Sequence, residues 1–329
     1  MAHVINKSDY TLDTKLLLDE ADKLGIKYRF LDREINLIEF SYQGKKRYRK
    51  GTYNLDTKIF GLEFSRKDLT YLLLDEHEIP HPQSLVVRSE DDFEKIKDDI
   101  EFPCVVKSPE GFGGFGVFTD ISKKKELKAK IKSILAKEST ALIQEQLTNT
   151  DFRLLADQRR VLHTVKRNPA RVFGDGKSTV KELVQKENEK PWRGPQLKQE
   201  LVKINIDKES KIALAKQNLS LSDVPKKDQQ VFLKTCCNQC KGGDIETVDA
   251  EVHPKFKEMA IKATRLFETP LAGIDIMADD ITKDPAEVNG KMIEVNIAPG
   301  VQIHQVPTYG KGVNIARMIF QTLFKEEFG

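Results

Sequence analysis

Apolar and polar positions alternate in two segments near the carboxyl end of the chain, and each segment ends in turn residues. These segments, residues 272–277 and 293–300, therefore predict β-strands. Asp275 lies in the first segment, and Glu294 and Asn296 lie in the second. Because strand side chains repeat every two residues, Glu294 and Asn296 project from one face, and Asp275 on a neighbouring strand joins them there.

Two carboxylates and an amide oxygen on one face form a set of hard oxygen ligands. Such a set suits Mg²⁺, which keeps several waters and also binds nucleotide phosphates. Taken singly, Asp275 or Glu294 is better explained as a strand residue that faces water or Lys291. Taken together, with a Gly-rich loop and a strand lysine upstream, they favour a metal–nucleotide site.

The first 62 residues predict a small α/β domain. A helical apolar face that ends at Gly25 precedes a strand at residues 27–31. Residues 35–40 and 46–53 then predict a hairpin whose turn contains Gly44. A helix, a strand and a hairpin are enough for one small layered unit.

The rest of the chain predicts two larger units, residues 63–150 and 151–329, and the α/β (α+β) class. The first unit has a helix at 66–76 and a strand at 84–87, followed by the order helix, strand, turn, strand, helix, strand over 89–147. Besides the two strands described above, the second unit has these predicted elements: a strand at 161–165 and helices at 180–187, 254–267 and 313–324. Residues 185–230 give the weakest structural signal.

Composition narrows the function classes. The 329 residues are 39% hydrophobic and 32% charged, with a net charge of +3, so nothing indicates nucleic acid as the main partner. The basic run at residues 45–50 is local and is better explained as part of a hairpin. Neither a membrane-spanning run nor a signal-peptide core is present, which predicts a cytoplasmic protein without a membrane partner.

Four cysteines fit a reducing compartment, and three of them cluster at Cys236, Cys237 and Cys240. The spacing of Cys237 and Cys240 is that of zinc ligands, but neither a second pair nor a histidine follows at finger spacing. We therefore expect thiols in a loop rather than a zinc site.

A Gly-rich loop follows a predicted strand that ends at Lys107. Four of its positions are glycine: Gly111, Gly113, Gly114 and Gly116. Glycine frees backbone N–H groups to fold over an anion, and a lysine adds a point charge for phosphate. The spacing fits neither the Walker pattern nor the dinucleotide fingerprint. A flexible hairpin tip is the alternative, and Lys107 shifts the balance toward phosphate.

A predicted strand at residues 141–145 leads past Leu147 to Asp151. The strand's end, with Gln144 and Glu145, has backbone groups suited to an adenine edge, and Asp151 has a carboxylate suited to ribose hydroxyls. From these residues alone, an exposed strand end with Asp151 as a helix cap is the better explanation.

Arg153 and Arg167 are strand arginines without an obvious local carboxylate. Stabilisation of an anionic substrate or acyl phosphate, and a structural salt bridge, are equally good explanations for each. Ser178 or Thr179 is suited to cap the helix that follows. His304, just after the turn at residues 298–300, is better placed than His253 to face a site.

In this order, the residues resemble the ATP-grasp superfamily of carboxylate–amine ligases. The likeness runs from about Lys67 to the carboxyl terminus and includes the strand lysine, the Gly-rich loop, the adenine strand and the Asp275, Glu294 and Asn296 set. Within the superfamily, segments such as residues 151–155, 167–170 and 294–300 resemble cyanophycin synthetase and bifunctional glutamate–cysteine ligase/glutathione synthetase.

The resemblance implies an ATP-grasp fold with a small amino-terminal domain, and amide formation through an acyl phosphate. It implies ATP with two Mg²⁺ ions, which Mn²⁺ can replace, and Asp275, Glu294 and Asn296 as metal ligands. Arg153, Arg167 and Asn296 are implied as catalytic residues. The implied nucleotide contacts are Lys67, Lys107, Gly111, Gly113, Gly114, Gly116, Gln144, Glu145, Leu147 and Asp151.

Three functions remain open at this point. A stand-alone glutathione synthetase, which joins γ-glutamylcysteine and glycine, leads, because we expect neither a glutamate–cysteine ligase module nor a Mur-ligase-like module. A cyanophycin-synthetase-like peptide ligase is the second, and a non-catalytic ATP-binding regulator is the third. The expected partners are a peptide or amino-acid carboxylate and an amine. Because ligases of the family that this chain resembles are commonly dimers or tetramers, we also expect a homo-oligomer.

Overall fold

A computed structural model describes most of the chain. The described residues are 10–32, 37–50, 53–54, 66–110, 116–195, 199–235, 237, 241–248 and 252–324. Three of the loop glycines (Gly111, Gly113 and Gly114) and two of the clustered cysteines (Cys236 and Cys240) lie outside these ranges. The predicted domain boundary at residue 62 also lies outside them. Within the described residues, no helix has the length and apolar character that a membrane span requires.

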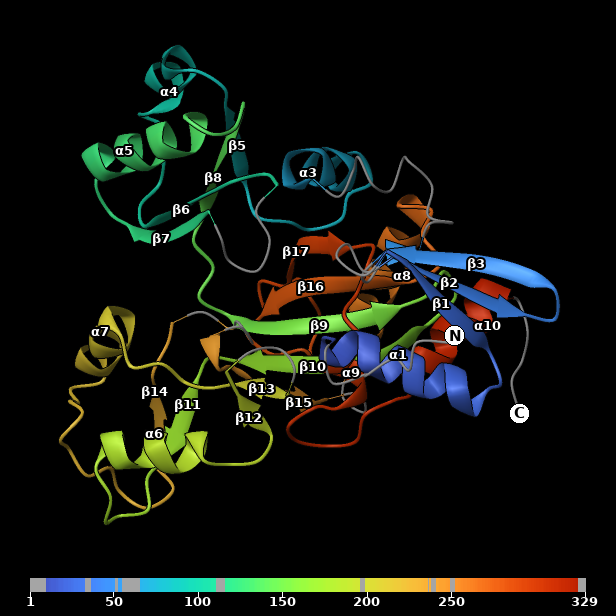
Figure 1. Cartoon of the computed structure of the whole chain (residues 1–329). Helices are drawn as coiled ribbons and strands as arrows, with labels where there is room; N and C mark the ends of the chain where they lie inside the picture. Colours follow the sequence, from blue (N-terminus) through green and yellow to red (C-terminus); the bar gives the residue numbers. More distant parts are fainter. Residues whose placement is uncertain are drawn as a thin grey trace.

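The centre of the molecule is a five-stranded antiparallel sheet in the order β15-β10-β9-β16-β17 (Figure 1). Its strands are β9 (Thr150–Ala156), β10 (Val161–Asn168), β15 (Asp244–Thr247), β16 (Ala272–Ala278) and β17 (Lys291–Asn296). Helix α8 (Pro254–Leu266) packs on one face, where Leu154, Phe256 and Ile274 belong to one buried cluster. Arg153, Arg167 and Asp275 alternate with these apolar positions and therefore project from the opposite face.

A second, four-stranded sheet has the order β5-β8-β6-β7 and lies apart from the central sheet in Figure 1. Its elements are α3 (Lys67–Glu76), β5 (Ser84–Val87), α4 (Glu90–Ile96), β6 (Cys104–Lys107), β7 (Val117–Ile121), α5 (Lys124–Leu135) and β8 (Ala141–Glu145). This is the element order that the sequence predicts. Helices α4 and α5 bury Phe93 and Leu127 against one face of the sheet. Helix α3 lies between this sheet and β17, because its Tyr71 reaches the backbone of Ile293.

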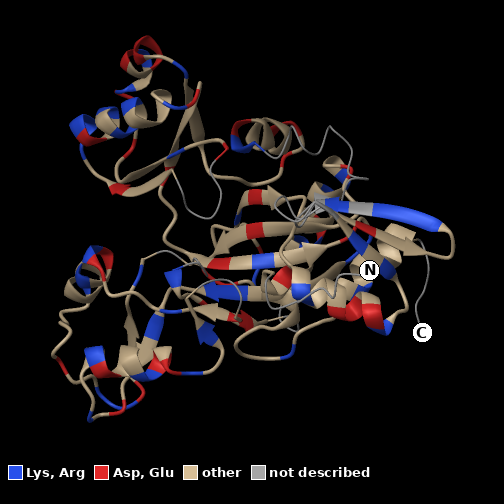
Figure 2. Cartoon of the chain, in the orientation of Figure 1, with Lys and Arg blue, Asp and Glu red and all other residues tan. Residues whose placement is uncertain are grey.

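The amino-terminal segment forms a third sheet, in the order β1-β2-β3-β4. Its elements are α1 (Leu12–Lys23), β1 (Lys27–Asp32), β2 (Leu37–Tyr42), β3 (Lys45–Lys50) and β4 (Tyr53–Asn54). The predicted hairpin is confirmed, with Gln43 and Gly44 at φ values of 46° and 77° in its turn. Strand β3 carries the basic run, and Figure 2 shows most of this strand in blue.

This amino-terminal sheet does not have a core of its own. Leu17 and Leu18 of α1 and Phe40 of β2 share one buried cluster with Phe320 of α10 (Ile315–Phe324), the last described helix. The rings of Phe40 and Phe320 pack edge to face, with centroids 5.0 Å apart. The first and last described helices, α1 and α10, therefore belong to one core.

Residues 168–233, which include most of the weakly predicted region, contain several short elements. These are β11 (Arg171–Phe173), α6 (Val180–Asn188), β12 (Arg193–Gly194), β13 (Leu201–Val202), α7 (Lys208–Lys216) and β14 (Gln230–Phe232). Thr179 caps α6 through a capping box with Glu182, as one of the two predicted caps. The remaining short helix, α9 (Gln302–Gln305), follows β17 and its turn.

Candidate active site

Antiparallel pairing of β16 with β17 brings the three predicted metal ligands together. Asp275 lies directly opposite Glu294, and Gly273 lies opposite Asn296. Directly paired residues in an antiparallel sheet share a face, so both carboxylates project from the same side. Asn296 lies two residues further along that face, where its side-chain amide donates to the Gly273 carbonyl at 3.3 Å. Figure 2 shows the acidic positions on β16 and β17 beside basic positions on β9 and β10.

Asp275 is 2% exposed, and two arginines hold its carboxylate. Arg153 donates to it through both Nε and Nη2, the latter at 2.9 Å from Oδ2, and Arg167 Nη2 donates to the same oxygen at 2.8 Å. Burial opposes ionisation, but the two positive charges outweigh it and keep the pKa of Asp275 below its usual value. Both arginines thus form salt bridges, one of the two explanations that the sequence left open, and their partners come from strands adjacent in space rather than in sequence.

Asp151 belongs to the same group of charges. It lies in β9 opposite Arg167, whose Nη2 donates to Oδ1 and Oδ2 at 2.7 and 2.9 Å. Burial raises the pKa of Asp151 to about 6 against the attraction of Arg167, and the charge of Asp275 adds to the increase. Asp151 is a strand residue, so the alternative that it caps a helix is wrong. Asp151, Arg153, Arg167 and Asp275, hereafter the arginine–aspartate cluster, have no net charge together.

Lys67 of helix α3 and Lys107 of strand β6 both lie near Glu294 and Asp275. Lys67 Nζ lies 3.3 Å from Glu294 Oε1, so Glu294 faces this lysine rather than Lys291. Lys107, 8% exposed at the end of β6, donates from Nζ to the Tyr71 hydroxyl at 2.9 Å. Burial lowers the pKa of Lys107 to about 8, although the charges of Glu294 and Asp275 favour its protonated form.

Gly116 is the glycine of the Gly-rich loop that the structure describes, and it is hydrogen-bonded to the residue that follows Lys107. Gly116 has a φ of 71°, a left-handed conformation that favours glycine, and its carbonyl accepts from the Ser108 amide at 3.0 Å. A Cβ at Gly116 would also lie 3.1 Å from the Ser108 Cβ. Glycine is therefore required at this position for two separate reasons.

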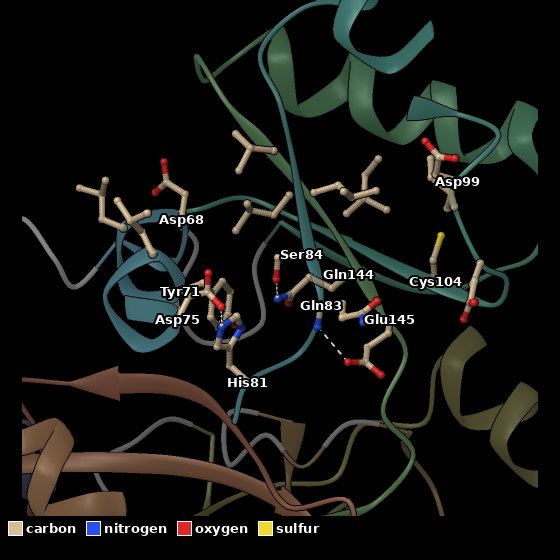
Figure 3. Close-up of a pocket in the computed structure, with 18 of the residues that line it drawn as sticks. Asp68, Tyr71, Asp75, His81, Gln83, Ser84, Asp99, Cys104, Gln144 and Glu145 are labelled. Carbon is tan, nitrogen blue, oxygen red and sulfur yellow. Dashed lines mark hydrogen bonds and ion pairs between the residues drawn. The ribbon is translucent and has the colours of Figure 1, made fainter. Parts of the chain in front are cut away.

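Gln144 and Glu145 line a cavity of about 620 Å³ beside α3 (Figure 3). Gln144 is buried and donates from its side-chain amide to the Ser84 hydroxyl, and Glu145 accepts from the Gln83 amide at 2.8 Å and from Lys291. Leu147 is partly buried just beyond the strand. Tyr71 also lines this cavity, whereas Lys67, Lys107 and Glu294 do not. The predicted adenine and phosphate contacts thus lie on different sides of Tyr71.

His304 is fully buried, and its Nδ1 lies 3.1 Å from Nδ1 of His163 in β10. His163 Nε2 lies 3.2 Å from the Lys311 carbonyl, which can only accept a hydrogen bond, so Nε2 is the protonated nitrogen of that ring. When His163 is neutral, its Nδ1 accepts and His304 Nδ1 donates. Burial, followed by the nearby charges of His163 and the arginines, keeps the pKa of His304 far below its usual value. His304 therefore contacts a second histidine and is neutral.

The described residues contain no group of three His, Cys, Asp or Glu side chains that could hold a metal ion. Asp275, Glu294 and Asn296 fall outside such a group because the third member is an amide. Their oxygens nevertheless form the hard donor set that Mg²⁺ prefers. Glu294 and Asn296 are partly exposed, and Asp275 has two oxygens already shared with guanidinium groups. The donor set fits Mg²⁺ in an arrangement where the Asp275 carboxylate binds the ion and the two arginines together.

Sequence reasoning missed two residues of this region, Tyr71 and His163. Tyr71 follows Lys67 by four residues in a predicted helix, a spacing that places both side chains on one face. That spacing was a usable signal. His163 gave none, because its role depends on an interaction with a residue 141 positions away.

Comparison with known families agrees with this arrangement. An ATP-grasp-like domain matches residues 9–54, and a RimK-like ATP-grasp domain matches residues 65–189. The first match lies in the amino-terminal segment. The motifs alone indicated a resemblance to ATP-grasp ligases only from about Lys67 onward.

Two kinds of bifunctional or multidomain protein are similar in sequence. The glutathione biosynthesis bifunctional protein GshAB of Clostridium perfringens (strain 13 / Type A) is 29% identical over 330 residues, which is 98% of this chain and 42% of that protein. Cyanophycin synthetase of Geminocystis herdmanii (strain PCC 6308) is 30% identical over 317 residues, which is 95% of this chain and 36% of that protein. The chain thus spans about two fifths of the length of the first and about a third of the second.

The crystal structure of a bifunctional glutathione synthetase from Pasteurella multocida is similar in fold, with a TM-score of 0.75 and 23% identity. The match covers 98% of this chain and 44% of that one. The predicted fold class is confirmed: this chain contains ATP-grasp domains and has the ATP-grasp fold.

Proposed function

We propose that the chain is an ATP-dependent carboxylate–amine ligase that forms an amide bond through an acyl phosphate, and that its reaction is that of glutathione synthetase. In this reaction ATP transfers its γ-phosphoryl group to the carboxylate of γ-glutamylcysteine. The amine of glycine attacks the acyl carbon, phosphate leaves with the C–O bond electrons, and the nitrogen loses a proton.

One observation carries the proposal. Two carboxylates, Asp275 and Glu294, lie opposite each other on paired strands, and two lysines, Lys67 of α3 and Lys107 of β6, approach the same place. Phosphoryl transfer depends on positioning and charge neutralisation rather than on covalent help from the protein. A site with cations on one side and oxygen ligands on the other supplies both.

Each group has a role that follows from its position. Lys67 and Lys107 neutralise the phosphate chain of ATP. Arg153 and Arg167 stabilise the negative charge that develops on the phosphoryl group and on the tetrahedral intermediate, a role worth about 10²–10³ in rate for a single donor. Asp275, Glu294 and Asn296 would hold Mg²⁺, which supplies charge neutralisation at the β- and γ-phosphates when it is bound.

A peptide ligase similar to cyanophycin synthetase is the second candidate. Cyanophycin synthetases match this chain at the same level of identity as GshAB and over a similar share of its length. One methylene in a substrate changes discrimination by only about 1–3 kcal/mol. The residues proposed to bind phosphate therefore do not decide whether the substrate carboxylate belongs to γ-glutamylcysteine or to a peptide primer.

Product mass spectrometry beside ADP release tests the proposal. The purified protein receives Mg-ATP with γ-glutamylcysteine and glycine, and in parallel an aspartate-containing peptide primer with free amino acids. We expect glutathione in a one-to-one ratio with ADP. Ligation with the primer alone would move the protein to the second candidate. Nucleotide binding without amine-dependent ADP release in either mixture would instead identify a non-catalytic ATP-binding regulator.

The control variant is Glu294→Gln, which keeps the shape of the side chain and removes its charge. We expect turnover to fall by at least about 10²-fold, since a metal ligand and the partner of Lys67 are lost together. Full activity of this variant would refute the assignment of Glu294.

A further inference from the structure

Helix α3 carries Lys67 and links the four-stranded sheet of β5 to β8, hereafter the small sheet, to the central sheet. Lys107 lies on the small sheet, and the carboxylates lie on the central sheet. Lys67 and Tyr71 are one helical turn apart and share a face. Lys67 Nζ lies 3.3 Å from Glu294 Oε1, and the Tyr71 hydroxyl donates to the carbonyl of the preceding residue, Ile293, at 2.6 Å. The backbone amide of Lys67 also donates to the Pro109 carbonyl at 3.1 Å, in the segment after β6. The helix is thus tied to both sheets.

Tyr71 links Lys107 to β17 through a single oxygen atom. Its hydrogen is used by the Ile293 carbonyl, so toward Lys107 this oxygen can only accept. The Lys107 ammonium donates to it at 2.9 Å and lies 5.3 Å from the centre of the phenol ring. Tyr71 and Lys107 are 4% and 8% exposed. A buried ammonium is costly unless a hydrogen-bond acceptor faces it, and the phenol oxygen supplies this acceptor.

The surroundings of Tyr71 fix the position of its ring. His81 stacks on the ring with centroids 5.3 Å apart and an angle of 21° between the planes, and Figure 3 shows the two rings side by side. The charged groups that act on the Lys107 ammonium are Glu294 and Asp275. The tyrosine, which itself lines the cavity with Gln144, therefore holds the ammonium near the carboxylates.

We propose that Tyr71 is a positioning residue of the nucleotide site, which holds the Lys107 ammonium against β17 so that the remaining donors of the ammonium face the phosphates of the nucleotide. This inference rests on the proposed function, because it needs a nucleotide at Lys107. It adds a residue that the resemblance to ATP-grasp ligases did not indicate. It also explains why an ammonium with a pKa lowered to about 8 is buried without a carboxylate in direct contact.

The test measures the affinity of a non-hydrolysable Mg-ATP analogue for Tyr71→Phe across a pH series from 6.5 to 9.5. Loss of the hydroxyl leaves the ring and its stacking in place. At pH 7 we expect affinity to fall by up to about tenfold, because binding must then immobilise a Lys107 side chain that the phenol no longer holds in place. Without an acceptor the pKa of Lys107 falls further, so the loss of affinity at high pH should begin at a lower pH than in the wild-type protein. A merely structural tyrosine would not move this pH profile.

Tyr28→Phe is the matched control. It removes the hydroxyl of a β1 residue, which bonds Asp22 of α1 in the amino-terminal part of the chain. It should bind the analogue as the wild-type protein does. A second comparison places Tyr71→Phe in a Lys107→Met background, where the proposal expects no further loss.

Two results would overturn the inference while leaving the proposed function intact. One is a Tyr71→Phe protein with wild-type affinity and pH profile. The other is an equal loss in the presence and absence of Lys107. If instead the wild-type protein and the Tyr28→Phe control fail to bind any ATP analogue, the proposed function itself fails.

Discussion

At the scale of single residues, the site is a set of charges that neutralise one another. The arginine–aspartate cluster and the Lys67–Glu294 pair place a cation against every carboxylate that the site would offer to a metal. Their burial differs, however, since Asp275 is enclosed and Glu294 is partly exposed. Chemically similar substitutions at the two carboxylates should therefore have different consequences.

Asp275→Asn should destabilise the fold, whereas Glu294→Gln should not. Removal of Asp275's charge leaves two buried guanidinium groups with one carboxylate, which costs about 3–5 kcal/mol. Glu294→Gln breaks a partly exposed pair and should change the free energy of unfolding by less than about 1 kcal/mol. Urea unfolding of the two variants measures the difference. Equal losses would contradict the buried cluster as described.

His304 predicts a pH dependence of stability. Its pKa in the folded chain lies far below the ordinary value of about 6.5, so the neutral ring is the folded form. The unfolded chain takes up a proton that the folded chain rejects, and stability is therefore complete above about pH 6.5 and falls as the pH drops below it.

Thermal unfolding between pH 7.5 and 5.5 checks this expectation. His304→Gln should show a shallower decline of the midpoint with falling pH than the wild-type protein does. His77→Gln, in a partly exposed histidine at the end of α3, should keep the wild-type slope. A His304→Gln slope equal to that of the wild type would contradict the assignment.

At the scale of secondary structure elements, the turn after Asn296 depends on the first helix of the chain. Asp13 of α1 accepts from the backbone amide of Gln302 at 2.6 Å, at the start of α9. Burial raises the pKa of Asp13, against the hydrogen bond from Gln302. A residue near the amino terminus thus orients the segment that follows the last predicted metal ligand.

Asp13→Ala should release that segment. We expect the Gln302 amide to exchange its hydrogen at least about tenfold faster, because a hydrogen bond to a charged group contributes roughly 1.5–3 kcal/mol. Hydrogen exchange followed by NMR or mass spectrometry gives the measurement. Asp22→Ala, on an exposed part of the same chain segment, is the control and should leave the Gln302 amide protected. Unchanged exchange in Asp13→Ala would show that other contacts hold α9.

Most elements could be predicted from the sequence where local pattern and turn chemistry agree. The alternation around Asp275 and Glu294, the Gln43-Gly44 turn and the Thr179 cap each carry a local signal, and each lies where it was expected. The region at residues 185–230 gave the weakest signal, because strands of two residues are too short to show a periodic pattern.

The site could be predicted in part for the same reason. The residue types of Lys107, Asp275 and Glu294 pointed to phosphate and metal chemistry from the sequence alone. The partners of Arg153 and Arg167 could not be predicted, since Asp275 becomes a neighbour of Arg153 only when β9 pairs with β16. The same holds for Tyr71, whose two partners come from two different sheets.

At the scale of the whole molecule, the three larger sheets differ in whether they have an apolar core of their own. The small sheet has its own apolar cluster under α4 and α5, whereas the amino-terminal sheet shares its cluster with α10. Substitutions in these clusters should therefore loosen different sets of elements.

Phe320→Ala should destabilise the amino-terminal sheet together with α10. Truncation of a buried phenylalanine costs about 3–5 kcal/mol, and the elements that share its cluster should lose protection as a unit. In hydrogen exchange we expect faster exchange in α1, β1 and β2 as well as in α10. Leu127→Ala in α5 is the counterpart, and it should affect the small sheet instead. Faster exchange in the small sheet alone after Phe320→Ala would refute this division.

The packing of α1 against α10 also matters while the chain is being made. Glu20 and its partner Arg317 are separated by 297 positions, so the first helix emerges from the ribosome roughly 15–60 s before its partner, at 5–20 residues per second. During that interval Leu17, Leu18 and Phe40 have no apolar partner from α10. The apolar cluster of the amino-terminal segment is therefore completed only after α10 has been made.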